Sequence, residues 1–264
     1  MIRVDDAADA RLDDYRGLPD LERRAGLEAA RGVLIAEGAV PIRTLLGSGR
    51  RVRSLLLVER EHARLAADLA GVDAPVYVAR LDLLRTVAGF DVHRGALAAA
   101  DRFEPPAPAE LLRAARRVVV LEGTSSVENL GAVFRNAAAF GFDGVLLDPA
   151  CGDPLVRRAV RVSAGHTLTV PFARVDGAPA ALAALRAAGF RSLALTPRAD
   201  AAPIDRLAPD GERLALLLGA EGSGLSEAAL LAADERVRIP MAPGIDSLNV
   251  AVAAAVAMHR VARL

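Results

Sequence analysis

The chain has 264 residues, and 53% of them are hydrophobic, which is enough for one large domain or two ordinary ones with buried cores. No apolar stretch reaches the roughly 18 residues that a membrane helix needs. The chain starts with acidic and polar residues, whereas a signal peptide starts with basic and then apolar ones. We therefore expect a cytoplasmic globular protein without membrane spans. The 33 basic residues, all of them arginine, balance 33 acidic ones, so charge alone does not indicate a nucleic-acid partner.

Cysteine and histidine are too sparse to suggest a metal site. Cys151 is the single cysteine, which rules out an internal disulfide and a thiolate cluster. The histidines His62, His93, His166 and His259 are far apart, and none forms an HxxxH or HxH pair. We therefore expect no bound metal.

Up to a proline-rich stretch at 104–109, the chain is typical of a small α/β domain. Strands are predicted over 32–38, 54–58, 76–78 and 95–99, and helices over 41–46 and 61–70. Closely spaced prolines favour an extended linker, because proline cannot continue a helix or a central strand. We therefore expect an N-terminal domain at 1–104, a linker at 105–109 and a second domain at 110–264.

Strands and helices alternate more sharply in the second domain. Strands are predicted at 117–121, 144–147, 167–170, 192–196, 214–218 and 237–239, and helices at 130–140, 155–163, 179–188, 227–233 and 248–264. This alternation predicts a parallel sheet with helices on both faces. Because ligands bind such sheets at the carboxyl ends of the strands, the loops that leave these ends are the candidates for function.

The first such loop follows the strand at 117–121. Asn129 stands where a helix N-cap is expected, and Leu130, Val133 and Phe134 fall on one face of the helix that follows. Arg135 does not share that apolar face. Taken alone, a capped surface helix with a solvated arginine explains the segment equally well.

Two further loops follow the last strands. The loop at 218–227 holds three glycines, which let a backbone approach a ligand closely, but its GxxGxG spacing is not the dinucleotide-binding fingerprint. The loop at 239–250 leads into a helix rich in alanine and valine, which Asp246 or Ser247 is placed to cap. Core packing explains that helix, but it leaves the polar Ser247 and Asn249 at its start unexplained.

Together the three loops resemble the three signature motifs of the SpoU (TrmH) family of RNA methyltransferases, in the SPOUT superfamily. The motifs are NLGxxxRNA at 129–137, GAEGxGL at 219–225 and IPMxxxxxSLNVAVA at 239–253. The segment at 153–165 is also similar to the family. Before the linker, 31–38 and the triplet His93-Arg94-Gly95 look like the family's appended substrate-binding domain, a ribosomal-protein-like α/β fold.

The resemblance implies a methyltransferase domain at 110–264 and an RNA-binding domain at 1–104. Family members are homodimers joined through the last helix of the C-terminal domain, and their parallel sheet carries a deep trefoil knot. General rules of chain topology would not have predicted a knot. The implied cofactor is S-adenosylmethionine, and the implied reaction is methylation of a ribose 2'-hydroxyl in RNA.

Carried over residue by residue, the motifs also imply site residues. The backbone of Gly219, Ile239 and Leu248 would hold the adenosine part of the cofactor, with Thr196, Ala220, Glu221, Met241 and Asn249 nearby. The reacting centre would contain Asn129, Arg135, Glu221, Ser247 and Asn249. Arginine is a poor proton acceptor, so we expect Arg135 to stabilise the developing alkoxide and to bind the adjacent RNA phosphate.

Three further arginines are candidates for RNA binding. Arg157, Arg158 and Arg161 lie at i, i+1 and i+4, close to one helical face, where they could bind an RNA backbone. A solvated helix surface is the alternative explanation.

Other functions stay open at this point. A nucleotide-dependent oxidoreductase fits the sheet but lacks the glycine fingerprint. A non-catalytic RNA-binding member of the family is disfavoured by the intact motifs, and base methylation is disfavoured because NLGxxxR accompanies ribose methylation in the family. The appended domain favours ribosomal RNA over transfer RNA as the substrate.

Overall fold

The computed structural model describes residues 1–18, 26, 28–92, 94–207 and 213–262. The chain forms two compact units, of which the first contains Met1–Glu104 and Asp153–Thr169 and the second contains Pro105–Gly152 and Val170–Leu264. Two sequence expectations, on His93 and on the last helical residues up to Leu264, fall outside the described residues. Each unit is described by itself below.

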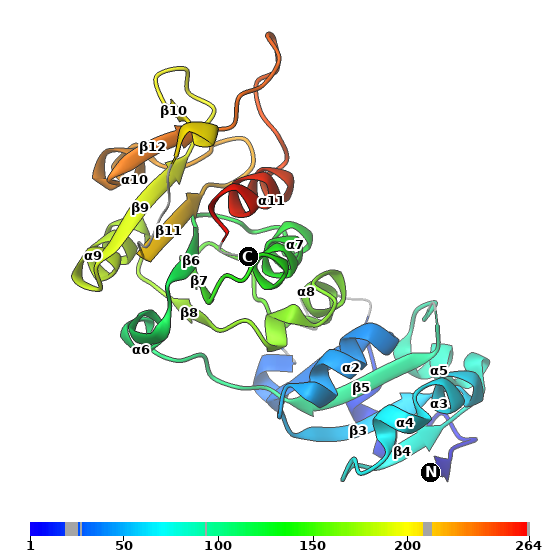
Figure 1. The fold of residues 1–264 in the computed structure, drawn as a ribbon. Helices are drawn as coiled ribbons and strands as arrows, with labels where there is room; N and C mark the ends of the chain where they lie inside the picture. Colours follow the sequence, from blue (N-terminus) through cyan, green and yellow to red (C-terminus); the bar gives the residue numbers. More distant parts are fainter. Residues whose placement is uncertain (19–25, 27, 93, 208–212, 263–264) are drawn as a thin grey trace. The chain divides into compact units, whose positions relative to one another are not determined.

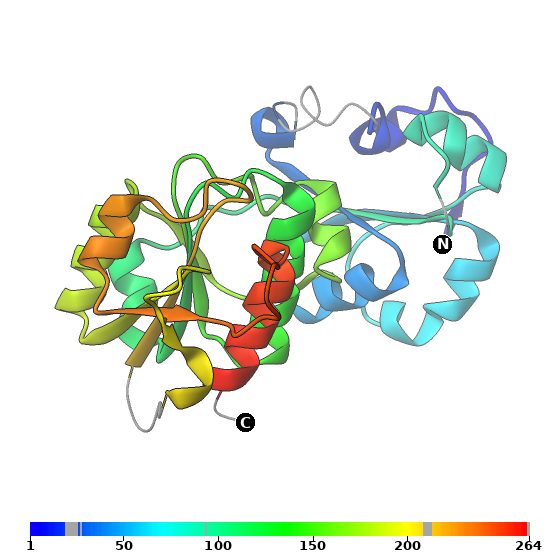
Figure 2. The same ribbon diagram turned by 90° about the horizontal axis from the view of Figure 1, so that it is seen from above.

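The first unit is a mixed five-stranded sheet with helices on both faces. Its strands are β1 (Ile2–Arg3), β2 (Val33–Glu37), β3 (Val52–Leu57), β4 (Val76–Val78) and β5 (Ala96–Asp101), in the order β1-β4-β3-β5-β2. The helices η1 (Ala10–Tyr15) and α5 (Leu81–Ala88) cover one face, and α2 (Ala39–Gly47), α3 (Glu59–Arg64) and α4 (Ala66–Leu69) cover the other (Figure 2). Leu12, Tyr15 and Leu84 pack on one face of the sheet together with Ile35 and Leu97.

A segment from the second half of the sequence completes this unit. Helix α8 (Arg157–Val162) packs against β2, and the guanidinium groups of Arg157 and Arg161 pair with the buried carboxylate of Glu37. These contacts explain why residues 153–169 group with the first unit, whereas the sequence-based division placed them in the domain at 110–264.

The prediction of a strand at 167–170 is wrong. The short helix η2 (His166–Leu168) occupies this position, and the hydroxyl of Ser163 accepts the N–H of Thr167 at 3.3 Å, which favours a helical turn. The strand forms later, as β8 (Phe172–Arg174).

The second unit contains the expected parallel sheet, with seven strands in the order β10-β12-β9-β11-β6-β7-β8 and every pair parallel. The remaining strands are β6 (Arg117–Leu121), β7 (Gly144–Leu147), β9 (Phe190–Leu195), β10 (Ala202–Pro203), β11 (Arg213–Leu218) and β12 (Glu235–Arg238). The central strands are buried along their length because helices cover both faces of the sheet.

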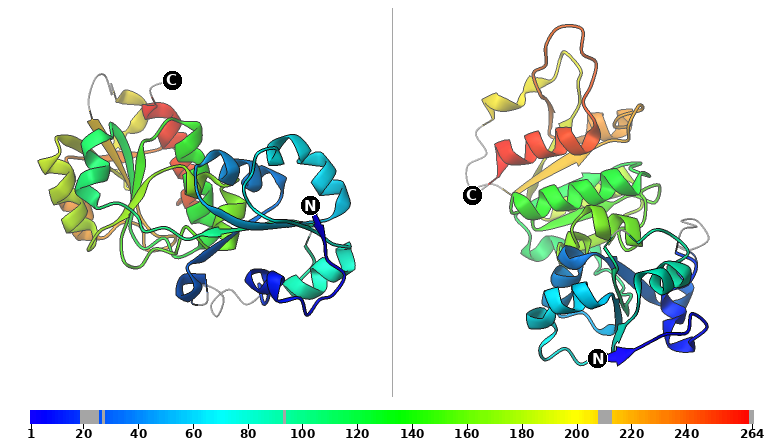
Figure 3. Two further views of the ribbon diagram at one scale, coloured as in Figure 1. Left: turned by 90° about the horizontal axis from the view of Figure 1, so that it is seen from below. Right: turned by 90° about the vertical axis from the view of Figure 1, so that its right-hand side faces the viewer.

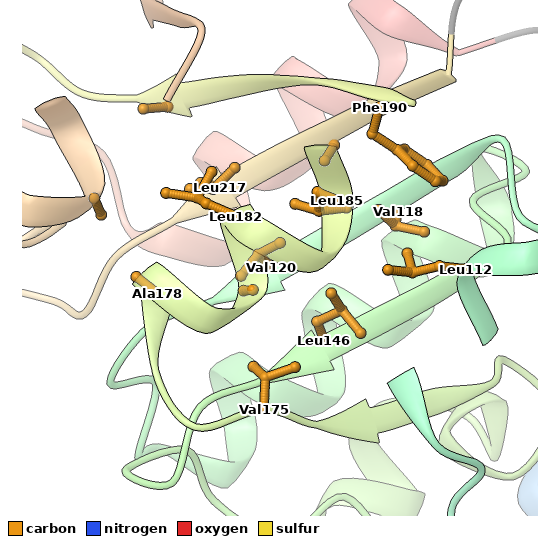
Figure 4. Packing of buried hydrophobic residues seen from close by; sticks show 14 of the residues in the cluster. Leu112, Val118, Val120, Leu146, Val175, Ala178, Leu182, Leu185, Phe190 and Leu217 are labelled. Carbon is orange, nitrogen blue, oxygen red and sulfur yellow. The ribbon is translucent and has the colours of Figure 1, made fainter. Parts of the chain in front are cut away.

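Helices α7 (Val127–Ala139) and α11 (Val250–Val261) lie side by side on one face of this sheet (Figures 1 and 3). Helices α6 (Pro108–Ala114), α9 (Ala178–Ala187) and α10 (Glu227–Ala232) cover the other face. There Leu182 and Leu185 of α9 meet Val118, Val120 and Leu217 of the central strands (Figure 4). Full burial of each such side chain contributes about 1.5–3 kcal/mol.

Both helix starts near the expected motifs differ from the sequence prediction. Helix α7 is capped by Ser126, whose hydroxyl accepts the N–H of Asn129, so Asn129 lies inside the first turn. Helix α11 is capped by Asn249, and neither Asp246 nor Ser247 has this role. Two amide side chains of the motifs are thereby placed at neighbouring helix starts, and the loops that carry them lie at the carboxyl edge of the sheet.

Candidate active site

A pocket of about 470 Å³ opens at the carboxyl edge of the second unit's sheet. Its walls come from the loops that follow β9, β11 and β12 and from the start of α11. The lining residues are Leu195, Thr196, Pro197, Arg198, Leu218, Gly219, Ala220, Glu221, Gly222, Ser223, Gly224, Leu225, Leu230, Ile239, Met241, Ser247, Leu248, Asn249, Val250 and Ala253. The pocket therefore brings together all eight residues expected to hold the cofactor.

The side-chain amide of Asn249 connects all three motif loops. Its Nδ2 donates to Oδ1 of Asn129 at 3.0 Å and to Oε1 of Glu221 at 2.6 Å. Its Oδ1 accepts the backbone N–H groups of Ala251 and Val252 at 3.0 and 3.2 Å. Because the amide oxygen serves as the cap of α11, the amide nitrogen is directed toward Asn129 and Glu221. Asn249 thus contacts two of the other four residues expected in the reacting centre.

The turn after β11 needs glycine at its first position. A Cβ at Gly219 would lie 2.1 Å from the carbonyl carbon of Gly224 and 2.2 Å from the backbone nitrogen of Leu225. The turn closes through a hydrogen bond of 2.9 Å from the N–H of Gly224 to the carbonyl of Ala220. Glycine is therefore needed at position 219 to let the turn close, and the closed turn lines the pocket with its backbone.

Glu122, directly after β6, fixes both ends of this turn. Its N–H donates to the carbonyl of Leu218 at 2.9 Å. Its carboxylate accepts the N–H and the hydroxyl of Ser226, both at 2.8 Å. Ser226 in turn caps α10 by accepting the N–H of Ala229 at 3.1 Å. Glu122 is not among the residues predicted from the sequence, although its position at a strand end was a usable signal.

The remaining expected residues of the pocket differ in exposure. Thr196 is buried, and its N–H donates to the carbonyl of Val237 at 2.9 Å. Ile239 and Met241 are half-buried, and Ser247 and Leu248 are exposed on the loop before α11. That loop projects from the sheet beside the loop that follows β9 (Figure 3).

Arg135 does not join this group of side chains. It is exposed on α7, it is absent from the pocket lining, and it forms no hydrogen bond or ion pair with any residue that the structure describes. The next residue, Asn136, donates through Nδ2 to the carbonyl of Ala251 at 2.8 Å. The guanidinium of Arg135 is therefore available to a partner.

The three arginines expected to bind RNA differ from one another. Arg157 has a side chain only 11% exposed, which pairs with Glu37 and stacks over the ring of Phe90 at 4.3 Å. A buried, paired guanidinium is not available to a phosphate, so Arg157 is no longer a candidate for RNA binding. Arg161 also contacts Glu37, at 3.2 Å, but is 49% exposed, and Arg158 is exposed.

Among the described residues, cysteine and the other potential metal ligands are not gathered into a site. In the described ranges, no group of three or more His, Cys, Asp or Glu side chains is arranged to hold a metal ion. Cys151 is buried, and this burial, aided by the neighbouring Asp148, raises the pKa of its thiol to about 12. No helix within the described residues is long and apolar enough to span a membrane.

Known proteins are similar to the chain in sequence and in fold. The model of the SpoU rRNA Methylase family matches residues 116–259. An uncharacterized tRNA/rRNA methyltransferase of Mycobacterium tuberculosis is 48% identical over 258 residues, which cover 97% of this chain and 90% of that protein. A 23S rRNA adenosine 2'-O-methyltransferase of Streptomyces laurentii is 38% identical over 162 residues, or 60% of this chain and 59% of that protein.

Solved structures resemble the chain over nearly its whole length. The AdoMet-bound rRNA methyltransferase from Sinorhizobium meliloti matches 98% of this chain and 96% of its own with a TM-score of 0.82, at 23% sequence identity. At that level of identity the match shows a shared α/β fold. The family match covers the part of the chain that contains all three loops of the pocket.

Proposed function

The chain belongs to the SpoU rRNA methylase family, and on that premise we propose that it transfers a methyl group from S-adenosylmethionine to a ribose 2'-hydroxyl of RNA. The observation that carries this proposal is the junction at Asn249, where residues from all three family motifs form hydrogen bonds at the edge of a pocket. The name of the Streptomyces laurentii relative, a 23S rRNA 2'-O-methyltransferase, supports the position of transfer on the ribose.

The pocket fits the proposed cofactor in size and in chemistry. Its volume of about 470 Å³ lies within the roughly 300–1,000 Å³ that is usual for small-molecule sites. Apolar residues such as Leu218, Ile239 and Met241 line it and suit an adenine ring. The close turn at Gly219 brings backbone polar groups to the wall, where they can bind the nucleoside.

In this proposal the cofactor supplies an electrophilic methyl group on a sulfonium, and the protein supplies position and charge. Glu221 lies beside Asn249 and stabilises positive charge at that end of the pocket. Asn129 and Asn249 keep one another oriented, and Ser247 lies on the same lining. Holding two reactants in line supplies much of the acceleration in such displacements.

Arg135 keeps its proposed role at the attacking oxygen, but the pocket of the same chain does not contain it. We propose that the protein is a homodimer joined through the exposed face of α11 and that a second copy supplies this arginine. Val252 and Val256 are 50% and 41% exposed and lie one turn apart on α11, which gives this face an unpaired apolar stripe. A guanidinium retains its proton at physiological pH, so it would stabilise the developing alkoxide.

We also propose that the chain contains the family's knot. Strand β12 lies beside β9, and β9 separates it from β11. Yet α11, which follows β12, returns to pack on α7 and β11. This return path supports a last segment threaded through the loops that line the pocket.

The first unit is proposed to bind the RNA in the cytoplasm. We propose that the mixed sheet of 1–104 is the family's appended domain. With Arg157 excluded, Arg158 and Arg161 on α8 are the two exposed cations of the expected set. Ribosomal RNA is the proposed substrate. Transfer RNA is the alternative, and the name of the Mycobacterium tuberculosis relative includes both.

Two experiments test the function. Calorimetry with micromolar S-adenosylmethionine is expected to give one site per chain, and Asn249→Ala is expected to weaken binding; no binding would overturn the proposal. Mapping 2'-O-methyl positions in ribosomal and transfer RNA, from cells with and without the gene, then identifies the substrate. Identical ribosomal maps would remove ribosomal RNA as the target.

A further inference from the structure

The pocket of the second unit carries a specific pair of charges. Among its described lining residues, two have a formal charge, the cation Arg198 and the anion Glu221. They come from different loops, after β9 and after β11. Glu221 is already bonded to the amide of Asn249. Arg198 is therefore the positive lining group for which the proposed mechanism has no role.

The backbone that carries Arg198 is held at the wall of the pocket. The preceding Thr196 is buried and bonded to Val237, and its hydroxyl accepts the N–H of Arg198 at 3.4 Å. Pro197 between them has its φ angle fixed by its ring. The base of the loop is therefore restrained, whereas the guanidinium is at the end of a long, flexible side chain.

The present partner of Arg198 is easily exchanged. Its guanidinium contacts both carboxylate oxygens of Glu227, and the two side chains are 42% and 66% exposed. Ion pairs this exposed to solvent contribute little to stability. Glu227 also lies in the first turn of α10, where the helix dipole favours a carboxylate without help from an arginine. Arg198 and Glu227 can therefore each stay charged at its position without the other.

We propose that Arg198 leaves Glu227 and binds the α-carboxylate of the methionine part of S-adenosylmethionine. This inference rests on the proposed function, since it assumes that this molecule occupies the pocket. Its amino-acid part has one carboxylate, and its ammonium and sulfonium groups are cationic. Glu221 complements the positive groups, and Arg198 complements the carboxylate with the planar, two-pronged geometry that guanidinium groups favour. The two lining charges then match the charge pattern of the ligand.

Calorimetry on the full chain can test this with two ligands that differ in one group. S-adenosylmethionine carries the α-carboxylate, and decarboxylated S-adenosylmethionine lacks it. We expect Arg198→Gln to weaken binding of the first about tenfold or more and to leave binding of the second within about twofold. Glu227→Gln, which removes the competing carboxylate, is expected to bind S-adenosylmethionine equally or more tightly.

A matched control comes from the neighbouring strand β12. Arg236 is 38% exposed and pairs with Asp200 at 2.9 Å, but it does not line the pocket. Arg236→Gln should bind both ligands like the unchanged protein. Equal weakening of both ligands by Arg198→Gln, or no weakening, overturns the role of Arg198. An unchanged cofactor affinity with a raised KM for RNA assigns Arg198 to RNA phosphate and also overturns it.

Failure of the proposed function gives a different result. If the unchanged protein binds neither ligand, the pocket is not a site for this cofactor, and both proposals fall together. If the unchanged protein binds both ligands with equal affinity, the α-carboxylate has no partner in the pocket, and the inference about Arg198 alone falls.

Discussion

The carboxylate of Glu122 accepts two hydrogen bonds from Ser226, one from its N–H and one from its hydroxyl, each at 2.8 Å. The two residues are 104 positions apart in the chain. They join the loop after β6 to the start of α10, and the turn between Leu218 and Ser226 forms one wall of the pocket. The shape of the wall therefore depends on a residue outside the three motifs.

We expect Glu122→Ala to release this turn. Hydrogen bonds to a charged group contribute roughly 1.5–3 kcal/mol each when protected from water. The two bonds of Glu122 are partly exposed, so we expect the variant to lose about tenfold in cofactor affinity and to show a small fall in Tm. Calorimetry and thermal unfolding measure the two effects. Glu110→Ala, an exposed change on α6, serves as control. A fall in Tm without any loss of affinity would show that Glu122 only stabilises the fold.

Gly219→Ala tests the close turn directly. The added Cβ would overlap the backbone at Gly224, where no flexible side chain can move aside. We expect the turn to shift and cofactor binding to weaken by more than tenfold, with the far-UV spectrum unchanged. Gly222→Ala is the comparison, because a Cβ there meets no atom within 4 Å, although its φ of +85° adds some strain. Equal effects of the two changes would contradict the steric argument.

Complementation between variants tests whether Arg135 acts across a dimer. Arg135→Ala and Asn249→Ala should each be inactive alone. When equal amounts of the two are unfolded and refolded together, about a quarter of full activity is expected from the mixture, because about half of the dimers are mixed and one of the two sites in each mixed dimer keeps all its groups. Val252→Glu places a charge on the proposed interface and should yield monomers in light scattering. Inactive mixtures of confirmed heterodimers would place Arg135 at the site of its own chain.

Cys151 gives a pH-dependent prediction. The thiol has a pKa raised to about 12 in the folded chain, first through burial and then through Asp148, against about 8.5 for a free cysteine. The native protein should therefore react with iodoacetamide negligibly between pH 7 and 9, whereas the unfolded chain reacts faster as pH rises. Because the folded state keeps a proton that the unfolded state loses, stability falls above about pH 8.5. Rapid alkylation of the native protein at pH 8 would contradict the burial.

Much of the second unit's fold was predictable because buried parallel strands consist of continuous apolar runs. The strands 117–121 and 144–147 were predicted residue for residue. The helix caps were not, because Ser, Asp and Asn are all good caps and tertiary contacts decide among them. Asn249 caps α11 while it also bonds Asn129 and Glu221, and no local pattern contains that information.

The site was predictable to the extent that its residues belong to motifs. Gly219, Met241 and Leu248, from the second and third motifs, all line the pocket. The contacts of Arg157 and Arg198 were not predictable, because each pairs with a carboxylate that is distant in sequence. Glu37, 120 residues away, pairs with Arg157 and keeps it from solvent, and Glu227, 29 residues away, is the partner of Arg198 in this structure.

The most direct test of the proposed chemistry follows a labelled methyl group. The purified protein is incubated with tritiated S-adenosylmethionine and RNA from cells that lack the gene, and the RNA is digested to nucleosides and separated. We predict tritium in a single 2'-O-methylated nucleoside, lost with Asn249→Ala. Tritium in a base-methylated nucleoside, or no transfer by a protein that binds the cofactor, would contradict ribose methylation at this site.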